Sequence, residues 1–406
     1  MGIYSEYLDR QFTFDQLAAE RKLQLKRIGE LRARDVLAFA ANLQNSRQPI
    51  AINYTDLLPI QDQIANLSGK AIDVILETPG GSGETVEDIV KLLRSRYESV
   101  GVIVPGVAKS AGTIFAMGAD EILMEAVSAL GPIDAQMMYQ GKVFSAHALL
   151  EGMKKIKDEV TQTGTLNKAY IPILQNISPG ELQHAENAYD FARDLVKDWL
   201  VRYKFKDWAT HSSTGQPVTA DERNLRAHEI AEQLRDHGKW KTHGRSIKID
   251  DLRAMRLLIT DYSGDPALCD AIRRYYTLLQ MTFATNVFKI FETPQSQIMR
   301  MEAIQQVALA GLPGIPNLPG LPQQIRDVQA AEIGVACAKC GNNVQVHAPF
   351  VPGLPVPPGA IPFPADNKLK CPTCGNELNL SDARRQLEAQ TRKTIVSSEG
   401  NANAAI

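Results

Sequence analysis

Pro79-Gly80-Gly81-Ser82-Gly83 and, further along, Lys109-Ser110-Ala111-Gly112 are the two stretches that decide the fold of this 406-residue chain. Each follows an apolar run rich in β-branched residues, at 72–76 and 100–104. After the glycines, residues 84–96 carry apolar side chains at helical spacing. Two strand-to-helix turns of this kind predict an α/β core.

The two turns also carry the chemistry of a serine nucleophile with an oxyanion loop. Glycine at 80 and 81 lets the backbone approach a ligand closely and point an N–H at it. The predicted helix after Ser110 begins with the N–H of Ala111, which has no intrahelical partner, and the helix dipole favours negative charge there. Two such donors beside a hydroxyl are what a tetrahedral oxyanion requires.

These turns, together with Gly118-Ala119-Asp120-Glu121-Ile122 and Leu130-Gly131-Pro132-Ile133-Asp134, resemble the Clp protease/crotonase superfamily. Within it the chain is most similar to the serine dehydrogenase proteinase family, which is related to signal peptide peptidase A. The resemblance covers about residues 45–292, with a weaker match at 244–258, where Met255-Arg256 stands in place of a usual Leu-Gly.

The resemblance implies a Clp/crotonase-type core of repeated ββα units with a helical insertion, and a serine endopeptidase activity. It implies Ser110 as the nucleophile and the backbone N–H groups of Gly81 and Ala111 as the oxyanion hole. The expected substrate is a protein or peptide, and a homo-oligomer is expected because fold relatives form rings or multimers.

The resemblance also suggests a lysine base, since serine is a poor nucleophile without a neighbour that takes its proton. In signal peptide peptidase relatives that neighbour is a lysine downstream of the serine, near a helix start. Lys142, which leads into a predicted helix over 146–157, matches that position. Burial would lower its pKa and leave a neutral amine. We interpret Lys109 as a solvated or charge-modulating side chain.

A histidine base is the alternative. Clp proteolytic subunits carry a histidine on the strand after the nucleophile helix, and the matching stretch here ends in Asp134 without one. His147, in the next predicted helix, can reach Ser110 with Asp134 as its orienting group. The histidines of the later helical stretch, including His237 and His243, are interpreted as surface or core-edge residues.

A second motif lies near the C-terminus, where Cys337-x-x-Cys340 and Cys371-x-x-Cys374 are each followed by a glycine. Two such pairs can supply four thiolates to a tetrahedral zinc ion. Disulfides or a redox site are the alternative, but no βαβ pattern surrounds either pair. We predict a structural zinc in a ribbon-like module, because four cysteines leave no open position for water.

Composition divides the chain into parts. We predict the following parts: a helical N-terminal arm at 1–45, the peptidase domain at 46–292 with its helical insertion at about 143–245, a helix and Pro/Gly linker at 293–332, the zinc-ribbon-like module at 333–380, and a tail at 381–406.

Charge and hydropathy exclude several classes of protein. The formal charge of −2 gives no electrostatic reason to expect nucleic-acid binding. Residues 2–22 are rich in charged side chains, so a secretory signal is not expected. The uncharged run at 275–288 is shorter than the roughly 20 residues of a spanning helix. We therefore predict a cytoplasmic protein without a transmembrane segment.

Two other functions stay open at the level of sequence. A crotonase-type acyl-CoA enzyme shares the fold and the oxyanion hole but lacks a serine nucleophile, so Ser110 argues against it. A non-catalytic oligomeric scaffold, whose zinc module binds a partner, stays open because the base is not identified.

Overall fold

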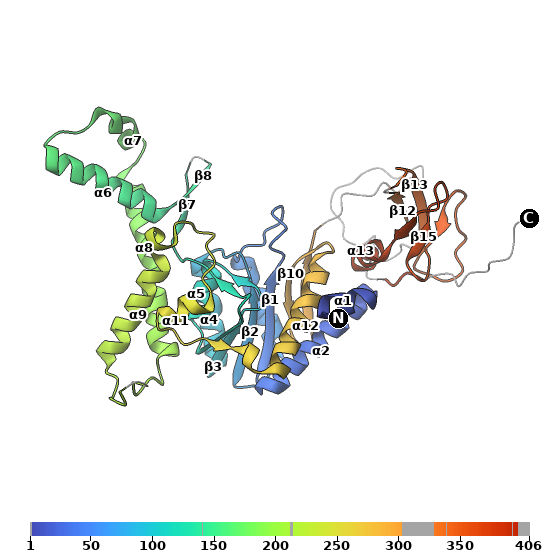
Figure 1. The fold of residues 1–406 in the computed structure, drawn as a ribbon, viewed down its shortest axis with the longest axis horizontal. Coiled ribbons are helices and arrows are strands. Elements are labelled where there is room, and N and C mark those ends of the chain that lie inside the picture. The colour runs from blue at the N-terminus through green and yellow to red at the C-terminus, as the bar shows by residue number, and fades with distance from the viewer. Residues whose placement is uncertain are drawn as a thin grey trace, which may run out of the picture. The chain divides into compact units, whose positions relative to one another are not determined.

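A seven-stranded, mostly parallel sheet forms the centre of the fold (Figure 1). The computed structural model describes residues 2–139, 141–211, 214–302, 329–337, 339–391 and 393–396. The strand order is β11-β10-β1-β2-β3-β5-β9; neighbours from β1 to β9 pair in parallel, and β10 is antiparallel to β1. The strands are β1 (Asp35–Ala41), β2 (Ala71–Glu77), β3 (Ser99–Ile103), β5 (Glu121–Met124), β9 (Thr260–Asp261), β10 (Val287–Glu292) and β11 (Gln297–Met301).

The central strands are buried on both faces, as the apolar runs predict for parallel strands. In β1 and β2 every residue after the first is buried. Helices α3 (Leu57–Ala65), α4 (Gly83–Arg96) and α5 (Ala111–Met117) contribute to the same core. The face of α4 expected from sequence is the buried one, with Val86, Ile89, Val90 and Leu93 inside. The prediction of an α/β core is confirmed.

A largely helical insertion follows the strands of the first half. It begins with the hairpin of β7 (Gln136–Tyr139) and β8 (Lys142–Ser145). Its helices are α6 (Ala146–Thr163), α7 (Ile171–Gln175), α8 (Pro179–Trp199), α9 (Ala220–Arg235) and α10 (His237–Trp240). Helices α8 and α9 add Val196, Trp199, Ile230 and Leu234 to the core, whereas α6 and α7 extend away from the sheet (Figure 1).

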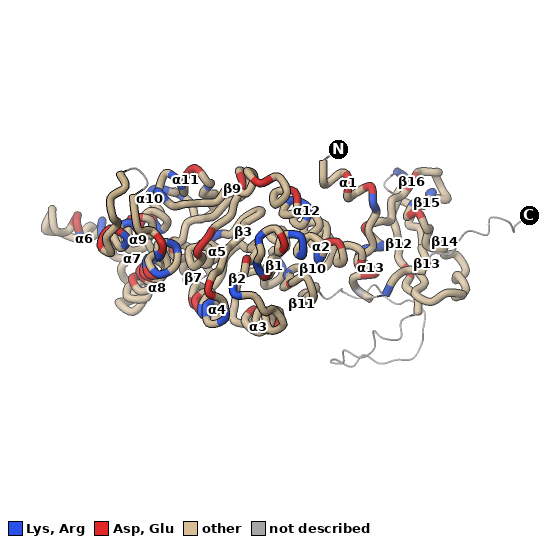
Figure 2. The backbone as a smooth tube through the Cα atoms, turned by 90° about the horizontal axis from the view of Figure 1, so that it is seen from below, with Lys and Arg blue, Asp and Glu red and all other residues tan. Residues whose placement is uncertain are grey.

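Charged residues of both signs lie along the helices of the core and of the insertion. Figure 2 shows Lys and Arg beside Asp and Glu along α4 and α8. Among the helices of the described ranges, none is both long enough and apolar enough to cross a bilayer.

Two predicted helical segments are strands instead. The helical N-terminal arm was expected to extend through residue 45, but α2 (Phe14–Arg32) ends earlier and β1 follows it. The run Val36-Leu37-Ala38-Phe39-Ala40-Ala41 has no polar residue to give it helical periodicity, and pairing with β2 and β10 decides its state. After residue 293, β11 lies where a helix was expected to begin, and the rest of that predicted segment lies mostly outside the described residues. The predicted Pro/Gly linker lies mostly outside the described residues.

The chain divides into two compact units. One comprises residues 24–276 and 289–299 and holds most of the sheet and the insertion; the other comprises residues 1–23, 277–288 and 300–406. The second unit contains α1 (Ile3–Asp9) and most of the described C-terminal residues. Helix α12 (Pro266–Phe283) belongs to both.

The C-terminal module is built of short strands around its own core. Strand β13 (Asn343–Pro349) pairs with β12 (Ala330–Ala336) and β14 (Ile361–Pro362), and β15 (Lys368–Lys370) pairs with β16 (Glu377–Asn379). Its buried side chains include Val344, Val346, Phe363, Leu378 and Leu387. The predicted tail begins with a helix, α13 (Ser381–Thr391), which contributes Leu387 to this core.

Candidate active site

The glycine turn leaves β2 and enters α4 in a conformation that only glycine adopts readily. Gly80 has φ +108° and Gly81 φ +148°. A Cβ on Gly81 would lie 2.3 Å from the carbonyl oxygen of Ile52. The Ile52 N–H donates to Gly80 O at 2.8 Å, and the Ser82 N–H donates to Ile52 O at 3.0 Å. The glycine loop therefore pairs with the segment around Ile52 through backbone hydrogen bonds.

Ser110 occupies the residue before α5 with strained backbone angles, φ +50° and ψ −116°. A positive φ is costly for a residue with a side chain, and such strain persists where the surroundings enforce it. The Ser110 carbonyl accepts the first α5 bonds, from Thr113 N at 2.8 Å and Ile114 N at 3.2 Å. The serine side chain makes no capping bond to the helix and is half-buried.

Gly80 and Ser110 are in direct contact. A Cβ on Gly80 would lie 2.7 Å from the Cβ of Ser110 and 3.3 Å from the amide nitrogen of Ala111. The Thr78 N–H donates to Val107 O, and the Lys109 N–H donates to Thr78 O, each at 3.0 Å. These bonds place the predicted oxyanion loop beside the predicted nucleophile.

The Glu77 side chain, at the end of β2, binds the short strand that precedes Ser110. It accepts the N–H of Val107 at 2.9 Å and the hydroxyl of Tyr276 at 3.1 Å. Val107 belongs to β4 (Val107–Ala108), which leads directly to Ser110. Burial raises the pKa of Glu77 to about 7, although the bonds from Val107 and Tyr276 oppose that rise.

Asp134 is fully buried and holds two histidines. Its Oδ1 lies 2.7 Å from His243 Nδ1, and its Oδ2 lies 3.1 Å from His237 Nδ1. Burial alone would raise the pKa of Asp134, but the bonds from His243 and then His237 outweigh it and lower the pKa. Both rings are about 30 % exposed, whereas the Asp134 side chain has no exposure. A buried carboxylate on Nδ1 leaves Nε2 as the proton acceptor.

The residues before Asp134 run along the nucleophile helix. Strand β6 (Ala129–Leu130) pairs with β4, and Thr113 Oγ1 bonds to both the N–H and the carbonyl of Gly131 at 2.9 Å. Asp134 therefore follows within three residues of a segment fixed to α5.

The segment that carries His243 is attached to the residue before Ser110. Lys109 Nζ donates to Arg245 O at 2.8 Å and to Ser246 Oγ at 3.0 Å. One residue further on, Ile247 pairs with Leu130 through two bonds of 3.0 Å. Burial, aided by the charge of Lys248, lowers the pKa of Lys109 to about 8. Lys109 was expected to be solvated or charge-modulating, and it instead joins the serine turn to the histidine segment.

Lys142, the predicted base, is the first residue of β8 and is exposed. The Lys142 side chain is therefore not buried within this chain, as the predicted base would be.

His147, the alternative base, contacts other residues. Its Nδ1 lies 3.1 Å from the Tyr189 hydroxyl, and its ring lies 6.2 Å from that of His237. Asp134 thus binds His237 and His243, which were expected to be surface or core-edge residues. The one sequence signal for His243 was its place just before the family-like segment at 244–258.

The four module cysteines come together. Their sulfur atoms all lie within 4.8 Å of one another, with Cys337–Cys374 at 3.6 Å and Cys340–Cys371 at 3.7 Å. The glycine after each pair has φ near +70°, and its N–H closes a turn on the first cysteine of that pair. Backbone N–H groups of Cys340 and Lys339 lower the pKa of Cys337 to about 6. This donor set fits a metal ion bound by thiolates.

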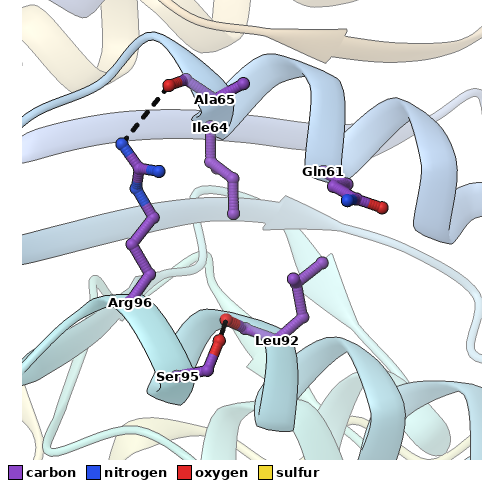
Figure 3. Close-up of a pocket in the computed structure, with 6 residues that line it drawn as sticks. All are labelled: Gln61, Ile64, Ala65, Leu92, Ser95 and Arg96. Atoms are coloured by element: carbon purple, nitrogen blue, oxygen red, sulfur yellow. Dashed lines mark hydrogen bonds between the residues drawn. The ribbon is translucent and has the colours of Figure 1, made fainter.

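A hollow of about 430 Å³ lies between α3 and α4, away from these groups (Figure 3). Its lining residues are Gln61, Ile64, Ala65, Leu92, Ser95 and Arg96. Ser95 Oγ donates to Leu92 O at 2.7 Å, and Arg96 bonds to Ala65 O at 3.5 Å. None of the predicted site residues lines it, so it is not the candidate active site.

The parallel sheet and the two strand-to-helix turns define a Clp-like α/β core. The chain belongs to the family of ClpP-like SDH-type serine proteinases, whose model matches residues 7–223. The predicted family is confirmed.

Individual relatives match a smaller part. Two uncharacterized proteins of Methanocaldococcus jannaschii are each 30% identical, over 158 and 144 residues, which is 38% and 36% of this chain. The matches span 51% and 44% of those proteins, so the chain covers about half the length of its curated relatives.

Two solved structures of the 1510-N membrane-bound stomatin-specific protease are also similar, one a serine-to-alanine mutant and one a lysine-to-alanine mutant in complex with a substrate peptide. Identity is 20% and 19%, with 34% and 41% of this chain and 64% and 80% of the other covered. The TM-score is 0.21 in both cases.

The raised pKa of Glu77 predicts a pH-dependent stability. Because its folded pKa of about 7 lies above the ordinary 4.5, the folded chain binds more protons between these values, and stability falls as pH rises through them. The Glu77→Gln variant has no carboxyl group at this position, so it does not show this fall of stability with rising pH. We expect the variant to gain up to about 3 kcal/mol of unfolding free energy relative to the parent between pH 5 and pH 8. Urea unfolding at both pH values measures this difference.

The matched control is Glu98→Gln, which neutralises an exposed glutamate that pairs with the exposed Lys70. It should follow the parent at both pH values. Parallel curves for Glu77→Gln and the parent would show that Glu77 is ionised at pH 5 in the folded chain.

Proposed function

We propose that this chain is a serine endopeptidase in which Ser110 attacks the scissile carbonyl. The contact between Gly80 and the strained Ser110 supports the proposal, because it brings the glycine turn against the residue that carries the hydroxyl and against the amide nitrogen of Ala111. As the Oγ–carbon bond forms, negative charge moves to the carbonyl oxygen, and these two N–H groups stabilise it.

We propose His243 as the base, oriented by Asp134. The proton of Ser110 passes to the imidazole, and the imidazolium then gives it to the leaving amine as the carbon–nitrogen bond breaks. A water molecule releases the acyl group by the same steps in reverse. The 2.7 Å contact with a buried carboxylate supports His243, as does the attachment of its segment to Lys109. Lys142 and His147 remain the competing bases predicted from sequence.

We propose zinc as the ion of the cysteine cluster. Four thiolates in a closed set are typical of structural zinc, which would hold the module together and take no part in hydrolysis. A cytoplasmic location, a homo-oligomeric state and a protein or peptide substrate remain predictions.

The nucleophile is tested with a fluorophosphonate probe and a fluorogenic peptide library. We expect the parent to be labelled at Ser110, and Ser110→Ala to lose both labelling and hydrolysis, a loss on the order of 10⁶ when a triad serine is removed. Ser95→Ala, at the surface hollow, is the control and should keep both. Undiminished hydrolysis by folded Ser110→Ala would reject the peptidase proposal and leave the acyl-CoA enzyme or scaffold.

The base is tested by ranking single variants on one peptide substrate. His243→Ala should lower kcat by roughly 10²–10⁴-fold, the usual contribution of a general base. His237→Ala and His147→Ala should lose less, because Asp134 still holds His243. Lys142→Ala should stay near the parent, since the side chain is exposed. The largest loss in Lys142→Ala, with His243→Ala active, would assign a lysine base.

The metal is tested by elemental analysis of reductively purified protein. We expect about one zinc per chain, lost in Cys371→Ser, because four thiolates form the site. Cys269→Ser is the control, since this buried cysteine lies outside the cluster. Chelation should unfold the module while hydrolysis of a small ester survives. Freely alkylated cluster thiols in metal-free protein would contradict the proposal.

A further inference from the structure

One fully buried ion pair takes no part in the chemistry described above. Lys289, on β10, and Asp56, at the start of α3, both have side chains with no exposure. Lys289 Nζ lies 3.1 Å and 3.0 Å from the two carboxylate oxygens of Asp56. It also donates to the carbonyl of Ala51 at 2.9 Å.

The ion pair closes a short loop of chain around Ile52. Ala51 and Asp56 lie on either side of this residue, and the Asp56 carboxylate also accepts the N–H of Asn53 at 3.0 Å. An ammonium group has three donors, and here three acceptors from two points of one segment meet it. The backbone of residues 51–56 is therefore fixed from both ends.

That loop is the support of the oxyanion turn. The Ile52 N–H donates to Gly80 O, and the Ser82 N–H donates to Ile52 O. Gly81 packs directly against Ile52, since a Cβ on Gly81 would clash with the Ile52 backbone. The direction of the Gly81 N–H therefore depends on where Ile52 lies. The ion pair binds the residue just before Ile52, through the bond from Lys289 to the carbonyl of Ala51.

Stability alone does not account for a buried pair. Removing two charges from water costs as much as their attraction returns, and apolar replacements of similar volume are often neutral or stabilising. The three bonds of Lys289 instead fix a geometry that apolar side chains would leave loose.

We propose that Lys289 and Asp56 are positioning residues that hold the Gly80–Gly81 turn in the geometry that binds the oxyanion. The inference rests on the proposed serine peptidase function. Neither residue touches the substrate; both act through Ile52.

The test is a double variant, Lys289→Met with Asp56→Leu, assayed on a fluorogenic peptide substrate and against a peptide boronate, which mimics the tetrahedral oxyanion. We expect kcat to fall roughly 10²-fold, close to the loss of one oxyanion donor, with KM within about threefold of the parent. Affinity for the boronate should fall with kcat. A purely structural pair would leave kcat unchanged once the variant is folded.

The control breaks a comparable pair at the other end of β2. Asp73 has no exposure and binds Arg32 and Arg34 at 2.7 Å and 3.1 Å. Asp73→Asn should lower the unfolding midpoint but keep the kcat of the parent. Equal loss of kcat in both variants would attribute the effect to general destabilisation and reject the proposal.

Asp56→Asn, which keeps an acceptor for Asn53, is assayed in parallel and decides the matter if the double variant does not fold. It should lower kcat in the same direction with little change of KM, and parental kcat would overturn the proposal. Ser110→Ala separates the two levels: if it abolishes hydrolysis while the ion-pair variants keep the parental kcat, the peptidase stands and the positioning role falls.

Discussion

The missing side chain at Gly80 is the constraint on which the candidate site depends. With a Cβ there, the turn would overlap the Cβ of Ser110 at 2.7 Å, so the oxyanion loop and the nucleophile could not be neighbours. The strand bonds through Thr78, Val107 and Lys109 keep them in that contact. The positive φ of Ser110 lies at the same point, where the chain passes from β4 into α5.

Buried ionisable groups bind the segments that carry this contact between Gly80 and Ser110. Glu77 fixes the nucleophile strand, and Lys289 with Asp56 fixes the segment under the oxyanion turn. Each of these groups loses hydration energy on folding, as the raised pKa of Glu77 reflects. A fold optimised only for stability would place apolar side chains there. Their presence beside the two turns suits the proposed site, whose electrostatic groups would have to be preorganised.

Local patterns were readable from sequence, and long-range pairings were not. A few consecutive residues are enough to recognise each of the two turns, α4 and the cysteine pairs. Strand β1 did not, because an unbroken apolar run fits a helix or a buried strand equally well and its partner β10 lies far along the chain. The Asp134–His243 pair was missed for the same reason. It spans 109 residues, and bonds across the whole helical insertion, including the Leu130–Ile247 bridge, bring the two segments together.

The choice between the two bases is linked to assembly. Lys142 is exposed at the start of β8, without the burial that a lysine base requires. It would become a base only if another surface buried it, and the hairpin that carries it also exposes Met138 and Val143. A lysine mechanism therefore requires a second copy or partner over β7 and β8, and activity would fall on dilution. A histidine base has its orienting carboxylate, Asp134, in the same chain, so under the proposed mechanism its activity per subunit would be independent of concentration.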